Sequence, residues 1–284
     1  MTLQVFLNLI RCKNYIKNLI IFLPLFLNNT SWSVLSYINL VGPIIFFSFL
    51  ASSIYIINDL KDLALDKNHN EKRNRPIASG RVTVKSAKWI STFLALSSIL
   101  YFILFSNFKV LILVLFYFVL NIFYSYVLKK IKYLDLLTIS SGFIIRICIG
   151  AIISNVMISN FFLAQILFFG LFILICKRRE SFFAYSKTVV SIYSIKELNI
   201  LSKIFLFLNI INYFFYIFVD SRFTNSLSIE FSFIIFSFLI LKYYINTMKN
   251  IIFDPILIYF SDKYLVIFSG FYFFNFILGF YGYY

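Results

Sequence analysis

Long apolar runs follow one another along the whole chain, and they constrain its fold more than any other feature. A helix needs about 20 mostly apolar residues to cross the hydrocarbon core of a bilayer. Nine runs come near that length, so the pattern predicts an all-α polytopic membrane protein with about nine transmembrane helices. They lie at residues 15–28, 38–57, 89–105, 109–126, 133–153, 160–176, 204–219, 229–246 and 264–282.

Composition supports the same class of protein. Hydrophobic residues make up 61% of the 284 residues and charged residues 13%, and the mean hydropathy is +0.90. Soluble domains carry about 25% charged residues, so an ordinary soluble protein is excluded. Nine spans use ~180 residues, which leaves little for a domain outside the membrane. We therefore expect residues 1–284 to form a single integral-membrane domain.

The N-terminal part is the least regular. The first run is short, contains Pro24 and leads into polar residues 28–31. Residues 2–10 before it can form a short amphipathic helix at the membrane interface.

The basic residues predict the orientation. Almost all of the 26 Lys and Arg residues fall in alternate connecting segments, whereas the opposite segments hold only Lys109 and Arg222. Basic segments stay in the cytoplasm, so we expect a multi-pass protein of the inner (plasma) membrane with a cytoplasmic N-terminus. The net charge of +15 suits loops that face anionic membrane lipid and requires no nucleic acid as a partner.

Acidic residues gather directly after the second run. A helix that continues through them turns about 100° per residue and brings four oxygen-bearing side chains into one sector of roughly 100°. These are Asn58, Asp59, Asp62 and Asp66. Oxygen ligands without His or Cys suit Mg²⁺ and leave coordination positions for phosphate oxygens. A solvated acidic helix end is the alternative, but charge is costly beside lipid and a basic segment follows at once.

That basic segment is expected to turn back toward the carboxylates. Pro76 disfavours a helix at Arg75, and Gly80 offers a second break. The chain then folds over the membrane surface and brings Arg73 and Arg75 near the acidic residues. Carboxylates that hold Mg²⁺ beside guanidinium groups form a natural diphosphate site.

Other basic residues have a simpler interpretation. The loop from Tyr124 to Asp135 and the segment Lys177-Arg178-Arg179-Glu180 resemble ordinary cytoplasmic loops. Arg146 differs, because it lies roughly 20 Å into the fifth run, and Asp135 is about 16 Å away along the axis. Arg146 therefore needs a carboxylate from another helix, a water-filled cavity or a bound anion.

The segment Asn58–Asp66, followed by Arg75-Pro76-Ile77-Ala78-Ser79-Gly80 in a chain of nine apolar runs, resembles the UbiA superfamily of intramembrane prenyltransferases. The resemblance implies a helical bundle with a cytoplasmic-facing cavity, in which the acidic motif binds Mg²⁺ and the diphosphate of the donor. Typical aromatic prenyltransferases carry a second acidic motif after the sixth span. Here that place is taken by Lys177-Arg178-Arg179-Glu180, which counts against a prenyl diphosphate donor.

The chain is more similar to one branch of the superfamily, the decaprenyl-phosphate phosphoribosyltransferases. That similarity implies transfer of 5-phosphoribose from phosphoribosyl diphosphate to a polyprenyl phosphate with release of diphosphate. The residues that carry it are Arg11–Asn18, Tyr126 with Leu128-Lys129, Leu134-Asp135, Gly142-Phe143 with Arg146 and Gly150-Ala151, Asp254-Pro255 and Asp262-Lys263.

The resemblance also implies roles for particular residues. Three carboxylates and an amide would hold Mg²⁺ and act on the leaving diphosphate: Asp59, Asp62 and Asp66, with Asn58. Cations would neutralise its outer oxygens: Arg73, Arg75 and Lys129, with Tyr126 nearby. Lys177 and Arg178 would receive the 5-phosphate of the ribose, and Lys17 and Arg146 would hold the lipid phosphate.

Two other functions stay open. One is a UbiA-type aromatic prenyltransferase that uses polyprenyl diphosphate and 4-hydroxybenzoate or a quinone precursor, which calls for a second acidic motif. The other is a multi-pass transporter or lipid flippase, in which the loop charges only set the topology and Arg146 lines the pathway. The transporter leaves the one-sided acidic cluster unexplained. The sequence leaves homo-oligomer formation open.

Overall fold

The computed structural model describes residues 1–27, 34–69, 71–184, 192–219, 227–249 and 255–281. Across these ranges the ordered elements are all helices, which confirms the predicted all-α class. The chain divides into two compact units, residues 1–157 and 158–284. The single membrane domain predicted over the whole chain stays a prediction.

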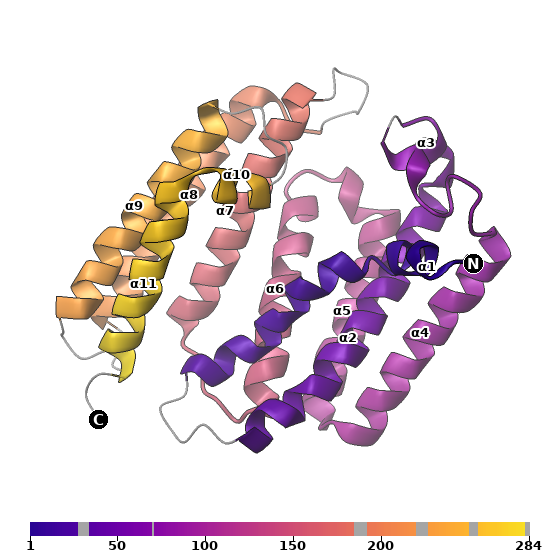
Figure 1. Ribbon diagram of the computed structural model, residues 1–284, viewed down its shortest axis with the longest axis horizontal. Helices are drawn as coiled ribbons and strands as arrows, with labels where there is room; N and C mark the ends of the chain where they lie inside the picture. The colour runs from indigo at the N-terminus through magenta and orange to yellow at the C-terminus, as the bar shows by residue number, and fades with distance from the viewer. Residues whose placement is uncertain (28–33, 70, 185–191, 220–226, 250–254, 282–284) are drawn as a thin grey trace. The chain divides into compact units, whose positions relative to one another are not determined.

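The first unit holds the N-terminal segment and four long helices, which run side by side (Figure 1). Its elements are α1 (Leu3–Leu9), η1 (Cys12–Leu27), α2 (Val34–Lys61), α3 (Leu63–Lys67), η2 (Lys72–Asn74), α4 (Val84–Phe105), α5 (Phe108–Tyr126), η3 (Leu128–Lys130) and α6 (Leu134–Ile153). The η elements are 3₁₀ helices.

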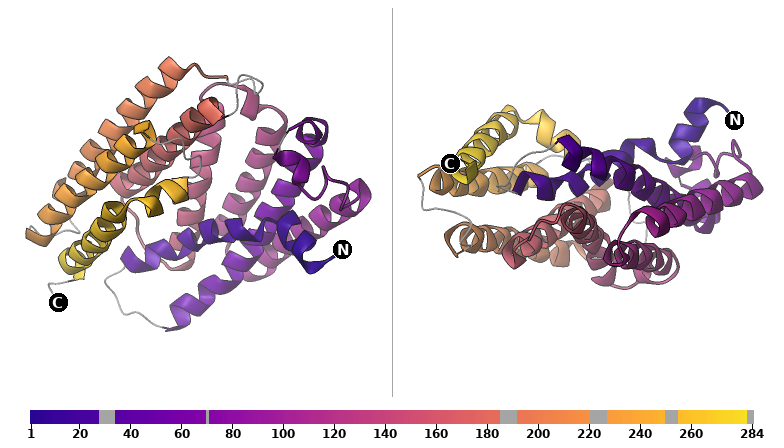
Figure 2. Two further views of the ribbon diagram at one scale, coloured as in Figure 1. Left: turned by 45° about the horizontal axis from the view of Figure 1, so that its top comes forward. Right: turned by 90° about the horizontal axis from the view of Figure 1, so that it is seen from below.

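The second unit consists of two helix pairs and a short connecting helix. α8 packs against α7, and α11 packs against α9 (Figure 2). The elements are α7 (Asn160–Ala184), α8 (Ile195–Val219), α9 (Leu227–Lys249), α10 (Pro255–Ser261) and α11 (Lys263–Tyr281).

Each predicted apolar run overlaps one helical element, but the elements are not equivalent. Within the described ranges, seven helices are long and apolar enough to cross a membrane, namely α2 and α4 to α9. The first run forms η1, a 3₁₀ helix of 16 residues, and the last forms α11, whose apolar part is Lys263–Gly279. The count of nine crossings therefore stays a prediction.

The side chains of α4 show why these helices belong in lipid. Ser91 and Ser98 face the inside of the unit and are buried, whereas Phe93 and Leu96 are 70% and 63% exposed. Small residues let helices approach closely, and large apolar residues on the outside are stable only in an apolar solvent. The pattern is that of a membrane helix.

Close packing and polar contacts fix η1 on its neighbours. A Cβ atom at Gly150 of α6 would lie 2.0 Å from the carbonyl oxygen of Ile21, so only glycine permits this approach. The Asn18 side chain donates a hydrogen bond to Ser48 of α2 at 2.8 Å. Long 3₁₀ helices are uncommon in proteins, and these contacts stabilise this one. The N-terminal segment is thereby held against the helix that carries the acidic residues.

Candidate functional site

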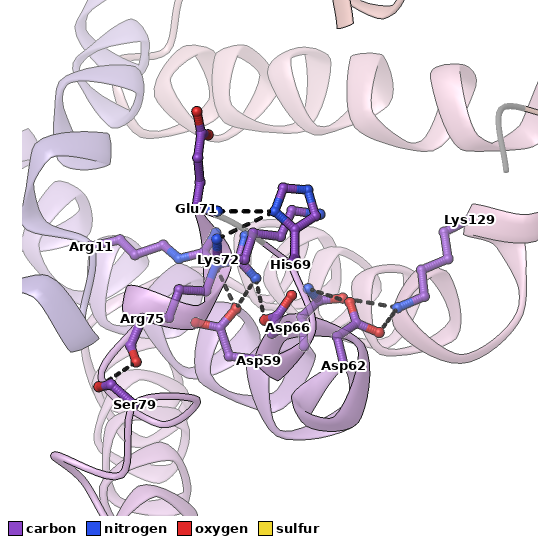
Figure 3. A network of polar contacts seen from close by, with 11 residues as sticks. Arg11, Asp59, Asp62, Asp66, His69, Glu71, Lys72, Arg75, Ser79 and Lys129 are labelled. Carbon is purple, nitrogen blue, oxygen red and sulfur yellow. Dashed lines mark hydrogen bonds and ion pairs between the residues drawn. The ribbon is translucent and has the colours of Figure 1, made fainter. Parts of the chain in front are cut away.

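The predicted acidic residues lie together where α2 ends and α3 begins (Figure 3). α2 ends at Lys61 and α3 starts at Leu63, yet helical hydrogen bonds continue across the junction. The backbone amide of Asp62 donates to the carbonyl oxygen of Asn58 at 2.9 Å. The backbone amide of Asp66 donates to the carbonyl oxygen of Asp62 at 2.8 Å. The turns therefore stay in register, which keeps the carboxylates on one side.

One arginine binds two of these carboxylates. Arg75 Nη1 lies 3.0 Å from Asp59 Oδ1 and 2.6 Å from Asp66 Oδ2. The two carboxylates are 4% and 3% exposed, respectively. A buried carboxylate needs a paired charge or hydrogen bonds, and a single guanidinium nitrogen supplies both here.

The local sequence explains how Arg75 reaches them. Its backbone is extended (φ −61°, ψ 147°), as expected before Pro76, and η2 ends there. Gly80 has a φ of 75°, in the region that glycine adopts without strain. The chain turns back at both predicted breaks, and Arg75 comes to the carboxylates as expected.

Lys129 holds the third carboxylate. It lies in η3, and its Nζ is 2.5 Å from Asp62 Oδ1 and 3.5 Å from Asn58 Oδ1. Asn58 also donates a hydrogen bond to Asp62 Oδ2 at 3.2 Å. The loop after α5 thus supplies a cation to the acidic cluster, a pairing across 67 residues that the sequence did not predict.

Arg11 joins the same network, although it was not among the predicted site residues. Its Nη2 forms an ion pair with Asp59 Oδ1, the oxygen that Arg75 also contacts. The guanidinium lies 4.9 Å from the centre of the Tyr55 ring. Arg11 stands in the Arg11–Asn18 segment that resembles the phosphoribosyltransferase branch, and this was the only sequence signal that singled it out.

The donor set suits Mg²⁺, but its members are now paired with cations. Carboxylate and amide oxygens are the ligands that Mg²⁺ prefers. Among the residues that the structure describes, no group of three His, Cys, Asp or Glu side chains is arranged to hold a metal ion. Arg75 Nη1 bridges two carboxylates, as a metal ion would. A metal at that point requires Arg75 to move to another anion.

Three other residues predicted to contact substrate belong to the first unit and are exposed. Lys17 and Arg73 are exposed. Tyr126 is 49% exposed, and its ring centre lies 4.7 Å from Lys61 Nζ. The turn of η2 therefore brings Arg75 to the carboxylates and leaves Arg73 outside the network described here.

Arg146 is buried in the first unit with neutral partners. It is 6% exposed and donates to Asn18 Oδ1 at 2.7 Å, to the Gly142 carbonyl at 2.6 Å and to the Tyr117 hydroxyl at 3.0 Å. Its guanidinium carbon lies 4.9 Å from the Phe47 ring centre. Within the described part of the unit, these partners are neutral, and none of them is the carboxylate that was one of the expected partners. They tie η1, α2, α5 and α6 together.

Lys177 and Arg178 lie in α7 of the second unit, and both are exposed. The next residue, Arg179, donates to Asn199 Oδ1 at 2.7 Å and to the carbonyl oxygen of Thr247 at 2.8 Å. This end of α7 therefore presents two cations, and the third links α8 and α9. Asp254, another residue of the family resemblance, lies outside the described residues.

Sequence comparison gives the family. The model of the UbiA prenyltransferase family matches residues 19–181. A decaprenyl-phosphate phosphoribosyltransferase from Mycolicibacterium smegmatis is 32% identical over 174 residues, which cover 60% of this chain and 54% of that protein. The uncharacterized protein y4nM from Sinorhizobium fredii is 28% identical over 169 residues, covering 60% of this chain and 33% of that protein. The chain thus spans about half or less of the length of these curated relatives.

Structural comparison gives the same fold. A UbiA homologue from Archaeoglobus fulgidus, solved bound to DMAPP and Mg²⁺, has a TM-score of 0.72 to this chain. The match covers 95% of this chain and 98% of that one at 12% identity. Since the family model covers more than half of the residues and the fold agrees, this chain belongs to the UbiA prenyltransferase family.

Proposed function

We propose that this protein is a phosphoribosyltransferase of the UbiA family. It transfers 5-phosphoribose from phosphoribosyl diphosphate to a polyprenyl phosphate and releases diphosphate. The observation that carries the proposal is that acidic residues cluster in only one of the two segments where a prenyltransferase of this family has an acidic motif. Carboxylates cluster at the end of α2, whereas the segment at the end of α7 begins Lys177-Arg178-Arg179. The similarity to the Mycolicibacterium smegmatis relative supports the same donor and acceptor.

Asp59, Asp62 and Asp66, with Asn58, are the residues that would hold Mg²⁺. The bound ion supplies neutralisation of the charge that develops on the leaving diphosphate. Arg75 and Lys129, which now lie on the carboxylates, would turn to the outer phosphate oxygens. Charge-assisted hydrogen bonds of this kind stabilise the leaving group most in a site shielded from water.

The acceptor needs little help from the protein. A polyprenyl phosphate is already anionic at neutral pH, so no general base is required at the attacking oxygen. Lys17 is exposed on η1 and suits the lipid phosphate, while the isoprenoid tail lies along apolar helix faces. The neutral contacts of Arg146 favour a supporting role for that residue in place of a substrate contact.

The donor carries a second phosphate, on the ribose C5. Lys177 and Arg178 are exposed cations, and they suit that phosphate where a further acidic motif would repel it. This difference in charge is what would distinguish a phosphoribosyl donor from a prenyl diphosphate.

The test is release of diphosphate by the purified protein in the presence of Mg²⁺. One reaction contains phosphoribosyl diphosphate and polyprenyl phosphate, and the other contains polyprenyl diphosphate and 4-hydroxybenzoate. We expect Mg²⁺-dependent release from the first pair only. Release from the second pair only would make the protein a prenyltransferase, which the DMAPP-bound homologue keeps as the second candidate. No release from either pair would favour a transporter.

We place the site on the cytoplasmic side of the inner membrane, because the connecting segments that carry it are the basic ones. A cysteine substituted for the exposed Glu71, in a background without the native cysteines, tests this orientation. It should react with an impermeant maleimide in inverted vesicles and stay protected in intact cells.

A further inference from the structure

We infer that Arg11 is a diphosphate-binding residue and that Ser52 positions it. The N-terminal segment that leads from α1 into η1 then forms part of the active site. The inference rests on the diphosphate site of the proposed function, but it does not depend on which donor carries the diphosphate. Its starting point is the ion pair of Arg11 with Asp59, whose oxygen already has Arg75 as a partner.

The charges of the network fit a metal together with a diphosphate better than a metal alone. In the described part of the first unit, three carboxylates face three cationic side chains, so the network is neutral. They are Asp59, Asp62 and Asp66 with Arg11, Arg75 and Lys129. A Mg²⁺ ion adds two positive charges, and unpaired charge is costly next to lipid. A diphosphate group carries about two or three negative charges and restores the balance when the cations turn to it.

Arg11 is placed to make that turn. Its side chain is 25% exposed, whereas the side chain of Asp59 is 4% exposed. The Arg11 guanidinium is therefore more accessible to a ligand than the carboxylate with which it pairs. The Tyr55 ring at 4.9 Å restricts the plane of the guanidinium, and a held guanidinium can donate two parallel hydrogen bonds to phosphate oxygens.

Ser52 fixes the chain on both sides of Arg11. Its hydroxyl, which is fully buried, lies 2.8 Å from the carbonyl oxygen of Ile10 and 2.9 Å from that of Ser48 in its own helix, so these two acceptors share its one hydrogen. It also pairs with the Tyr15 hydroxyl at 2.9 Å. Ser52 and Asp59 are two helical turns apart, so they share one face of α2 about 10 Å apart along its axis. The serine therefore attaches the N-terminal segment where Arg11 can reach the acidic residue.

The backbone at Arg11 supports the same assignment. Its φ of 52° lies in the left-handed region, which a residue other than glycine seldom adopts. The surrounding contacts keep this conformation at the turn between α1 and η1, and such conformations concentrate at functional sites.

Binding of inorganic pyrophosphate with Mg²⁺ to the purified full-length protein tests the inference. We expect Arg11→Gln to weaken the affinity, measured by calorimetry, by about tenfold or more. Arg11→Lys keeps the charge and should recover part of it. The matched control is Lys13→Ala, an exposed cation two residues away, which should bind pyrophosphate like the wild type. Melting temperatures without ligand show that each variant is folded.

Kinetics test the positioning residue. Arg11→Gln should raise the KM for the donor, and Ser52→Ala should raise it less. If Ser52 acts through Arg11, Ser52→Ala should change nothing further in the Arg11→Gln background. If Ser52 were purely structural, Ser52→Ala would lower the melting temperature and raise the KM by the same factor in both backgrounds. That result would overturn its positioning role.

The outcomes separate this inference from the proposed function. Pyrophosphate affinity of Arg11→Gln equal to that of Lys13→Ala would refute the inference even in an enzyme that uses phosphoribosyl diphosphate. An Arg11-dependent affinity in a protein that uses only a prenyl diphosphate would support the inference and refute the proposed donor. A wild-type protein that binds no pyrophosphate would remove the diphosphate site and both proposals with it.

Discussion

Arg75 and Arg146 belong to the same compact unit and occupy opposite settings. Arg75 is 27% exposed and binds two carboxylates, whereas Arg146 is 6% exposed and binds an amide, a backbone carbonyl and a phenol. Carboxylates can exchange a guanidinium for a metal ion, which leaves the arginine available to a phosphate. Neutral partners cannot make that exchange, so they hold Arg146 in place. The type of partner therefore distinguishes an exchangeable cation from a fixed one.

Removing a carboxylate should break the exchangeable site and give the largest effect. Asp66→Asn leaves Arg75 with Asp59 alone and would take a charged ligand from the proposed Mg²⁺ site. Asp62→Asn leaves Lys129 without its carboxylate partner and likewise removes a charged ligand from the proposed site. We expect either change to lower diphosphate release by roughly 100-fold or more while membrane insertion is unaffected. Glu71→Gln, an exposed carboxylate in the same loop, is the control. Full activity of Asp62→Asn or Asp66→Asn would refute the metal site.

Removing Arg146 should break the fixed site through stability. Arg146→Ala leaves the buried side chain of Asn18 and the Tyr117 hydroxyl without their donor. The free energy of unfolding should fall by about 2–4 kcal/mol, visible as a lower melting temperature in detergent. The affinity for Mg²⁺ and pyrophosphate should change little in the folded fraction. An exposed cation, Lys109→Ala, is the control. Unchanged melting with lost pyrophosphate binding would instead place Arg146 at the substrate.

Lys177 is an exposed cation of the second unit, and its removal tests the proposed contact with the ribose 5-phosphate. Lys177→Ala should raise the KM for a donor with a 5-phosphate by about tenfold, because one charge-assisted contact is lost. Pyrophosphate lacks the ribose 5-phosphate, so its affinity should not change. Lys196→Ala, another exposed lysine of this unit, should leave both constants unaltered. An unchanged KM in Lys177→Ala would remove this lysine from the 5-phosphate site.

Asp262 combines the two kinds of partner, because it contacts one lysine and two neutral hydrogen-bond donors. Lys242 Nζ is 3.3 Å away, and Asn246 Nδ2 and the Tyr264 amide donate at 2.8 Å and 2.9 Å. Burial acts to raise the pKa of Asp262, but these donors outweigh it and lower the pKa below its usual value.

A lowered pKa gives Asp262 a small effect with a definite sign. Its stabilising contribution is present above the unfolded pKa of about 3.9 and is lost as pH falls through the lower folded pKa. Between about pH 5 and about pH 3, the melting temperature of the wild-type protein should fall further than that of Asp262→Asn. Parallel pH curves for the two proteins would contradict the prediction.

The parts of the site that the sequence predicted are those with local causes. The acidic face follows from helical spacing, and the return of Arg75 follows from Pro76 in a loop that separates it from Asp66 by nine residues. Arg11 pairs with Asp59 across 48 residues. Asn18 pairs with Arg146 across 128. Pairings of that range depend on how η1 packs, and no spacing in one sequence encodes them.

The winding of η1 changes how far its residues reach. As a 3₁₀ helix with a rise of about 2.0 Å per residue, its 16 residues extend about 32 Å, compared with about 24 Å for an α-helix of equal length. A bilayer has a hydrocarbon core about 30 Å thick. As a 3₁₀ helix the whole element is about as long as that core is thick, and it carries Lys13 and Lys17 within that length. The reach of a membrane segment thus depends on its hydrogen-bonding register as well as on its number of residues.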